Sequence, residues 1–187
     1  MSPPAPDFVS RAGHKLAAAL AAFNTRPTGR TCADLGSSTG GFVDCLLQHG
    51  AAKVYAIERG FGVLDYRLRT DPRVVVLERT NALTLALPES VDLVTIDVGW
   101  TRQRLILPIA RGLLAPGGSI ITLVKPHYEA EPRLLRRGIL PPEHIQPILA
   151  PLRDNLERMH LRLLNELESP LPGRAGNREW LWHLTPI

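Results

Sequence analysis

The stretch Ala33-Asp34-Leu35-Gly36-Ser37-Ser38-Thr39-Gly40-Gly41-Phe42 holds the pattern that decides the fold of this 187-residue chain. It begins as a short apolar strand, carries Asp34 near the end of that strand, and turns through glycines into the apolar segment 42–47. Glycine lets the backbone turn tightly and lets a ligand approach the main chain. A helix after such a turn presents unpaired N–H groups and the positive end of its dipole. The stretch therefore predicts a ligand site between a strand and a helix.

The spacing of the glycines narrows the class of ligand. The Gly-x-Gly-x-x-Gly fingerprint of dinucleotide-binding proteins is missing. Gly36 and Gly41 have the spacing of a Walker motif, but Phe42 stands where the phosphate-binding lysine belongs. These features favour a nucleoside ligand without phosphates, with S-adenosylmethionine as the leading candidate. The glycines alone also fit an ordinary tight turn between a strand and a helix. The residues expected around the ligand are Asp34, Gly36, Ser37, Ser38, Thr39, Gly40, Gly41 and Phe42, together with Glu58, Asn81 and Asp97 further along the chain.

Composition indicates one soluble globular domain over residues 1–187, with residues 1–7 as a loose N-terminal arm. Hydrophobic residues make up 44% of the chain and charged residues 21%, which is typical of a soluble protein. Residues 1–6 lack a signal-peptide pattern, and the apolar runs are too short to span a bilayer. We therefore expect a cytoplasmic protein without a membrane partner. Cys32 and Cys45 have apolar neighbours and no zinc-site spacing, so we expect buried free thiols and no metal site.

Strands and helices alternate along the chain, which predicts an α/β fold with a mostly parallel sheet. Ser10 is a plausible N-cap for a first helix that ends at Phe23. Further helices are expected at 41–49, 103–114 and 144–160, with prolines at 108, 147 and 151 kinking them or delaying their starts. Residues 115–118 should end the helix that precedes them. Residues 129–142 should form a surface loop. The expected strands are 31–35, 53–58, 74–77, 91–97, 119–125, 161–167 and 179–184.

Polar residues stand at or just after the ends of five expected strands, where open α/β sheets bind their ligands. Glu58 follows Asp34 by 24 residues, a spacing suited to an acid that accepts from the ribose hydroxyls of a cofactor. The alternative is that Glu58 is an ordinary solvent-exposed acid at the end of a strand. Asn81 could contact an adenine edge or simply form a turn. The remaining pair, Asp97 and Lys125, suggests catalysis, because a lysine beside an acid can serve as a general base or a positioning group. A structural ion pair remains possible.

The net charge of +4 permits a polyanionic partner. Several arginines could form a phosphate-binding face, with ordinary solvated surface as the alternative. They are Arg67, Arg69, Arg102, Arg104, Arg133, Arg136, Arg137, Arg174 and Arg178. The three tryptophans could stack on the bases of RNA. Core packing is at least as good an explanation for Trp182, whereas Trp100 is expected at the rim of the pocket.

Five passages of this chain carry a resemblance to the FtsJ-like ribose 2′-O-methyltransferases. Within that family the chain is most similar to the TlyA, or haemolysin A-type, rRNA methyltransferases. The passages are Phe8-Val9-Ser10-Arg11-Ala12-Gly13-His14-Lys15-Leu16, then 34–42, Arg73-Val74-Val75-Val76-Leu77-Glu78-Arg79-Thr80-Asn81, then 92–98, and Leu123-Val124-Lys125-Pro126.

The resemblance implies a class I, Rossmann-like methyltransferase fold. It implies a seven-stranded sheet with helices on both faces and an antiparallel last strand. It also implies S-adenosylmethionine as methyl donor and RNA, in the form of rRNA or a ribosomal subunit, as partner; the oligomeric state is not indicated. The family's Lys-Asp-Lys-Glu tetrad falls on Lys15, Asp97, Lys125 and Glu179. In this scheme Lys125 is the base or steering group, Asp97 and Glu179 set its charge state, and Lys15 orients the ribose or a phosphate.

Two departures from the family pattern bear on the RNA target. TlyA proteins carry an N-terminal S4 RNA-binding domain, which the residues before Phe8 are too few to form. The chain also has Val98-Gly99-Trp100 where a Ser-Phe pair is expected after the valine. These departures leave a catalytically inactive RNA-binding relative as the main alternative. A methyltransferase for a base or a small molecule would use a different catalytic set, and a pore former is suggested by the family name only.

Overall fold

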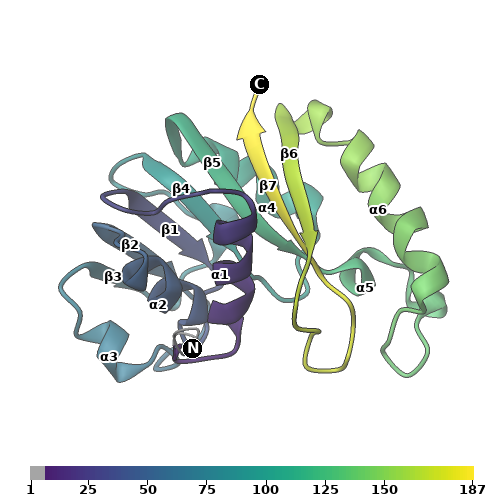
Figure 1. Cartoon of the computed structure of the whole chain (residues 1–187), viewed down its shortest axis with the longest axis horizontal. Helices are drawn as coiled ribbons and strands as arrows, with labels where there is room; N and C mark the ends of the chain where they lie inside the picture. Colours follow the sequence, from purple (N-terminus) through teal and green to yellow (C-terminus); the bar gives the residue numbers. More distant parts are fainter. Residues whose placement is uncertain (1–6) are drawn as a thin grey trace, which may run out of the picture.

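The computed structural model describes residues 7–187, so most of the expected N-terminal arm lies outside the described residues. One sheet of seven strands forms the centre of the molecule (Figure 1). The strands are β1 (Thr31–Leu35), β2 (Lys53–Ile57), β3 (Val74–Leu77), β4 (Val91–Ile96), β5 (Leu114–Val124), β6 (Leu161–Glu168) and β7 (Trp180–Pro186).

The strand order is β3-β2-β1-β4-β5-β7-β6. Strands β1 to β5 pair in parallel, whereas β7 runs antiparallel to both of its neighbours, β5 and β6. The chain therefore builds outward from β1 to β3 and then returns to place β4 on the other side of β1. Such a reversal opens a crevice beyond the carboxyl ends of the two central strands. The expected seven-stranded sheet with a reversed last strand is confirmed.

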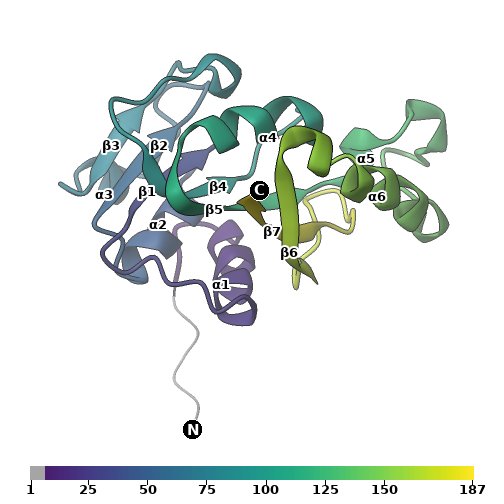
Figure 2. The same ribbon diagram turned by 90° about the horizontal axis from the view of Figure 1, so that it is seen from above.

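Helices cover both faces of the sheet, as Figure 2 shows from above. Helices α1 (Ala12–Ala22) and α2 (Gly41–Gln48) pack on one face, and α4 (Gln103–Gly112) and α6 (Ile145–Asp154) pack on the other. The short helices are α3 (Tyr66–Arg69), α5 (Pro126–Glu129) and the 3₁₀ turns η1 (Ala82–Thr84), η2 (Pro132–Leu134), η3 (Pro142–His144) and η4 (Glu157–Met159).

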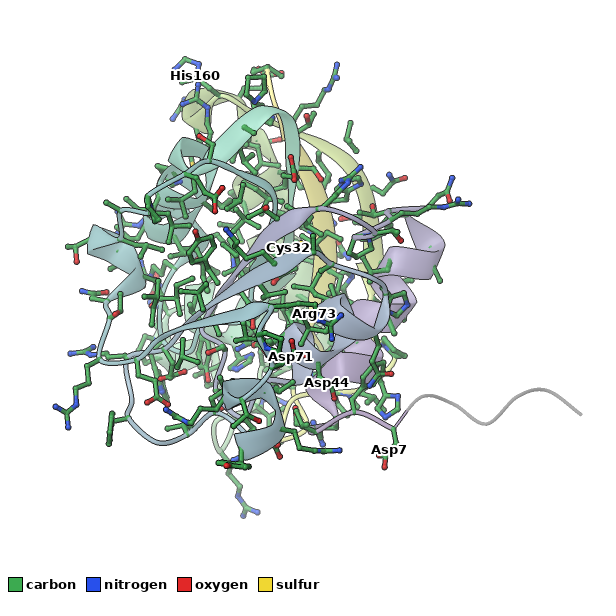
Figure 3. The ribbon with its side chains drawn as sticks, turned by 90° about the vertical axis from the view of Figure 1, so that its left-hand side faces the viewer. Asp7, Cys32, Asp44, Asp71, Arg73 and His160 are labelled. Atoms are coloured by element: carbon green, nitrogen blue, oxygen red, sulfur yellow. The ribbon has the colours of Figure 1, made fainter. Side chains whose placement is uncertain are left out.

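Side chains of β1 alternate between the two faces, because successive residues of a strand point in opposite directions. Ala33 and Leu35 join the core under α4 and α6. Cys32, which is labelled in Figure 3, joins the core under α1 and α2. Cys32 and Cys45 are buried and free, as expected. Burial raises the pKa of the Cys32 thiol to about 12. Both faces of the central strand are therefore apolar, and Asp34 is the exception.

Two of the expected features differ in the structure. Ser10 does not cap α1, because the helix begins at Ala12 with Arg11 as N-cap and no side-chain cap bond. The expected break at 115–118 lies within β5, which pairs Leu114 with Val91 and resumes regular pairing at Ser119 after an irregular stretch. Positive φ at Gly117 lets the chain bulge there while both ends of the strand stay paired with β4.

Prolines shift helix boundaries less than the sequence indicates. Pro108 lies inside α4, which begins at Gln103. Pro147 lies in the first turn of α6, where its missing N–H has no helical partner to lose. The expected helix 144–160 is shorter than predicted, because α6 ends at Asp154 and the chain continues as η4 to His160 at φ +54°. Among residues 7–187, no helix is long and apolar enough to cross a membrane.

Candidate active site

A cavity of about 660 Å³ opens beyond the carboxyl ends of β1, β2, β4 and β5, at the switch in strand order. It brings together segments that are far apart in the sequence: the start of α1, the turn after β1, the ends of the central strands, and the β6–β7 loop. The sequence-predicted site residues that line it are Lys15, Asp34, Gly36, Ser37, Ser38, Thr39, Gly41, Phe42, Glu58, Asn81, Asp97, Lys125 and Glu179.

The turn between β1 and α2 forms one wall of this cavity. Gly36 has φ +88°, and a Cβ at this position would lie 2.8 Å from the carbonyl oxygen of Asp97. Only glycine at position 36 therefore lets the segments that follow β1 and β4 run so close together. Gly40, at φ +104°, is the N-cap of α2, and a Cβ there would collide with Leu68. Gly40 shapes the turn but, unlike the other expected residues, is not among those lining the cavity.

Asp34 is a fully buried carboxyl group at the floor of the cavity. Its Oδ1 accepts a hydrogen bond from the Thr95 hydroxyl at 2.7 Å, and Oδ2 has no partner among the described residues. Burial raises the pKa of Asp34 to about 8, and the charges of Asp97 and Glu58 add to this rise. Ser37 Oγ is a second buried oxygen without a partner in the described chain. Both oxygens are therefore free to bond polar groups of a ligand.

Glu58 and Asn81 lie at the ends of β2 and β3 and line the same side of the cavity. Glu58 accepts from the backbone N–H of Ser38 at 2.8 Å and of Gly60 at 2.7 Å, so it also holds the glycine turn. Each carboxylate oxygen retains a free lone pair for a ligand hydroxyl. Asn81 Oδ1 accepts from Leu83 N at 3.1 Å, which makes Asn81 a capping residue of η1. Its NH₂ group remains for a ligand.

Lys125 follows β5 and meets Asp97, which follows β4. The distance between Lys125 Nζ and Asp97 Oδ1 is 2.7 Å, and the ammonium also donates to the carbonyl oxygen of Val98 at 3.0 Å. Both side chains are largely buried, with exposed fractions of 13% and 22%. A lysine ammonium has three N–H donors, so one remains after these two bonds. That third donor is available to a group entering the cavity.

Lys15 and Glu179 form a second ion pair that lines the same cavity. Lys15 comes from the second turn of α1 and Glu179 from the residue before β7, and their Nζ and Oε2 atoms are 2.5 Å apart. Both side chains are buried. Glu179 thus pairs with Lys15, whereas the sequence-based scheme assigns it to Lys125. All four tetrad residues line one cavity, but as two separate lysine–carboxylate pairs.

The aromatic residues near the cavity divide into exposed and buried ones. Trp100 is 87% exposed and lies with its ring centroid 4.8 Å from that of Tyr128 at the rim. Trp180 and Trp182 are buried in the core, so neither is available to stack on RNA bases. For Trp182 this agrees with the core packing that the sequence offered as the alternative, whereas the stacking expected of Trp180 is wrong. Trp180 reaches the core because it begins β7 beside Val124 of β5.

Sequence reasoning missed His127 as a lining residue. It follows Lys125 by two positions, so the strand-end signal that identified Lys125 applied to it as well. Burial and the charge of Lys125 lower the pKa of His127 to about 4, so its ring is neutral near pH 7. Nδ1 is buried and has no partner in the described part of the chain.

Taken together, the strand order, the single reversed strand and the cavity at the switch point define a class I methyltransferase fold. A family model described as "FtsJ-like methyltransferase" matches residues 8–185. The chain therefore belongs to the FtsJ-like methyltransferase family, which confirms the resemblance noted from the sequence.

Individual relatives agree with this assignment. The chain is 42% identical to the "16S/23S rRNA (cytidine-2'-O)-methyltransferase TlyA" of Mycobacterium tuberculosis, over 94% of this chain and 68% of the relative. It is 37% identical to "Hemolysin A" of Brachyspira hyodysenteriae, over 94% of this chain and 76% of the relative. A solved structure from Streptococcus thermophilus superposes with a TM-score of 0.93 at 34% identity, covering 98% of this chain and 68% of that one.

Proposed function

We propose that this protein transfers a methyl group from S-adenosylmethionine to a ribose 2′-hydroxyl of RNA, with ribosomal RNA as the expected substrate and the cytoplasm as the place of action. The observation that carries the proposal is the meeting of two lysine–carboxylate pairs with the glycine turn in one cavity. The rRNA 2′-O-methyltransferase named among the relatives supports the choice of substrate.

The residues around the glycine turn fit the cofactor. Asp34 Oδ2 and Ser37 Oγ are buried without partners among residues 7–187, and they suit the ammonium and the carboxylate of an amino acid, respectively. Glu58 has free lone pairs for two ribose hydroxyls, and the Asn81 NH₂ group suits an adenine nitrogen. When bound, S-adenosylmethionine supplies a reactive methyl group on a sulfonium.

The tetrad residues would act on the substrate hydroxyl. A 2′-hydroxyl is a weak nucleophile, so a base must take its proton as the new bond forms. Lys125 has one donor left after bonding Asp97 and Val98, and this donor orients the hydroxyl oxygen. Lys125 first releases one of its own protons to bulk water and then takes the proton of the 2′-hydroxyl, so the lysine ends the step as an ammonium. Lys15, held by Glu179, places the ribose or its phosphate, and correct placement lowers the barrier substantially.

The test of this proposal is methyl transfer from labelled S-adenosylmethionine to total ribosomal RNA, followed by mapping of ribose methylation as resistance to alkaline cleavage. We expect label on a 2′-oxygen with the wild-type protein. Lys125→Ala should lower turnover by at least about 100-fold, the usual contribution of a positioned acid or base. Its affinity for the cofactor should stay within about twofold, because Lys125 lies on the substrate side.

Lys53→Ala is the matched control, because Lys53 is the remaining lysine of the chain and lies at the amino end of β2, paired with Glu89. Label on a base or on protein would overturn the proposed reaction. Binding of cofactor and RNA without any transfer would instead favour the inactive RNA-binding relative.

A further inference from the structure

A two-residue turn lies in the segment after α5 and is bonded to Asn177, a residue that lines the cavity. Arg136 N donates to the Ile139 carbonyl at 2.8 Å, and Ile139 N donates back to Arg136 at 3.0 Å. Arg137 and Gly138 form the tip, with φ of +52° and +80°. Positive φ at both tip positions is the geometry of a tight hairpin, and it presents the exposed Arg137 side chain outward.

Asn177 fastens this turn to the β6–β7 loop. Its Oδ1 accepts from Leu140 N and its Nδ2 donates to the Gly138 carbonyl, both at 2.9 Å. Its own backbone carbonyl accepts from Gly173 N at 2.8 Å. The side chain is 2% exposed, so these bonds are shielded from water. In Figure 1 the β6–β7 loop and the segment after α5 lie along the lower edge of the molecule. One buried amide therefore holds two loops in a single arrangement.

Each of these loops carries an arginine with no carboxylate partner. Arg137 and Arg174 are exposed, and neither makes an ion pair or a side-chain hydrogen bond within residues 7–187. Arg174 also lines the cavity, three residues before Asn177. The neighbouring arginines differ, because they pair with nearby glutamates: Arg133 with Glu131, Arg136 with Glu143, and Arg178 with Glu168.

We propose that Arg137 and Arg174 form a phosphate-binding rim, held in place by Asn177, that grips the RNA backbone beside the nucleotide to be methylated. This inference rests on the proposed function. A ribose that reaches Lys15 and Lys125 brings a phosphate on each side, so phosphates must lie at the cavity rim. An unpaired guanidinium with a fixed planar fork matches a phosphate in two parallel hydrogen bonds. Five other arginines of the predicted phosphate-binding face pair with carboxylates, namely Arg67, Arg69, Arg133, Arg136 and Arg178. Arg102 and Arg104 make no ion pair within residues 7–187, but they do not lie on the two loops that Asn177 joins.

The test measures binding of a ribosomal RNA fragment, without cofactor, at several salt concentrations. Arg137→Ala and Arg174→Ala should each weaken binding roughly tenfold, the effect of losing one charge-assisted contact. Each should also reduce the slope of log affinity against log salt by about 0.7 to 0.9, as expected for one phosphate. Arg162→Ala is the control, because Arg162 is exposed at the amino end of β6, away from the cavity. It should change neither quantity.

Asn177→Ala tests whether the placement of the two arginines matters in addition to their charge. The variant keeps both arginines but removes the side chain that holds their loops together. We expect the loss of RNA affinity to match that of the Arg137→Ala/Arg174→Ala double variant, with cofactor affinity unchanged. Should Asn177→Ala fail to fold, the two arginine variants still decide the matter. An unchanged salt slope in the double variant, or an equal loss in Arg162→Ala, would overturn the proposal. Because the binding assay needs no transfer, failure of the proposed catalysis would appear separately, as RNA binding without methylation.

Discussion

Lys15 Nζ lies 2.5 Å from Glu179 Oε2, although 164 residues separate them in the chain. The pair joins the first helix to the last strand across the wall of the cavity, and both side chains are buried. Two ions leave water for this contact, so its value for folding is small even though breaking it is costly. Variants of this pair can therefore separate its effect on folding stability from its effect on methyl transfer.

Removal of one partner of this pair should destabilise the protein more than removal of both. Glu179→Leu leaves a buried ammonium alone and should lower the free energy of unfolding by about 3–5 kcal/mol, measured in urea. Lys15→Met/Glu179→Leu should recover most of that loss yet remain inactive in methyl transfer. Lys53→Ala breaks an exposed pair and should leave the free energy of unfolding almost unchanged. A double variant as unstable as the single one would contradict this account.

The pH dependence of cofactor binding should report on Asp34, whose pKa is raised to about 8 by burial. A bound ammonium needs the carboxylate, so cofactor affinity should rise between pH 6 and 8 and then level off. Binding below pH 8 should release a proton. Asp34→Asn should bind weakly with no such rise. Isothermal titration across pH 6–9 in buffers of different ionisation enthalpy measures both the cofactor affinity and the number of protons released. A wild-type affinity that does not change with pH would refute the assignment of Asp34 to the cofactor ammonium.

The same carboxyl group should affect the stability of the free protein in the opposite direction. Its folded pKa lies above the ordinary value of 3.8, so between these values the folded state holds the proton that the unfolded state releases. The contribution of Asp34 is therefore complete below about pH 4 and is lost as pH rises through 8. Comparison of wild-type and Asp34→Asn unfolding over this range isolates that contribution.

Gly36 should tolerate alanine far less well than another glycine of similar conformation. Gly29 has φ +73° and nothing within 4 Å of a Cβ, so Gly29→Ala should cost only the strain of a left-handed residue, about 1–2 kcal/mol. Gly36→Ala adds a collision with the Asp97 carbonyl, which would separate β1 from β4. We expect a larger drop in melting temperature and a loss of cofactor binding. Equal effects in both variants would show that the close approach is unimportant.

Trp100 should contribute to RNA turnover without contributing to folding. It is exposed, has φ +58°, and stacks near Tyr128 at the rim. Loss of one aromatic–base contact costs about 1–3 kcal/mol, so Trp100→Ala should raise KM for RNA while Trp100→Phe retains most activity. Urea unfolding should be unchanged in both. An unaltered KM in Trp100→Ala would remove Trp100 from the substrate site.

The sequence was most informative where the local pattern and the fold point to the same structure. The glycine turn, the acids at strand ends and the lysine after an apolar strand predicted a cavity at the carboxyl edge of a parallel sheet, and the structure has one. Alternation of strands and helices likewise predicted the fold, because short apolar strands buried on both faces have few other arrangements. The family resemblance then placed all four tetrad residues.

Residues far apart in the chain were less predictable, because their partners depend on side-chain packing rather than on spacing. The sequence could not show that Glu179 bonds Lys15 rather than Lys125, or that Asn177 joins two loops. Nor could it separate the buried Trp180 from the exposed Trp100. Local chemistry in the stretch 33–42 was enough to predict a ligand site, and the alternation of strands and helices was enough to predict the fold. The pairing of charges around that site arises only when the sheet brings distant segments together, because the energy of a buried ion depends on its partner in space.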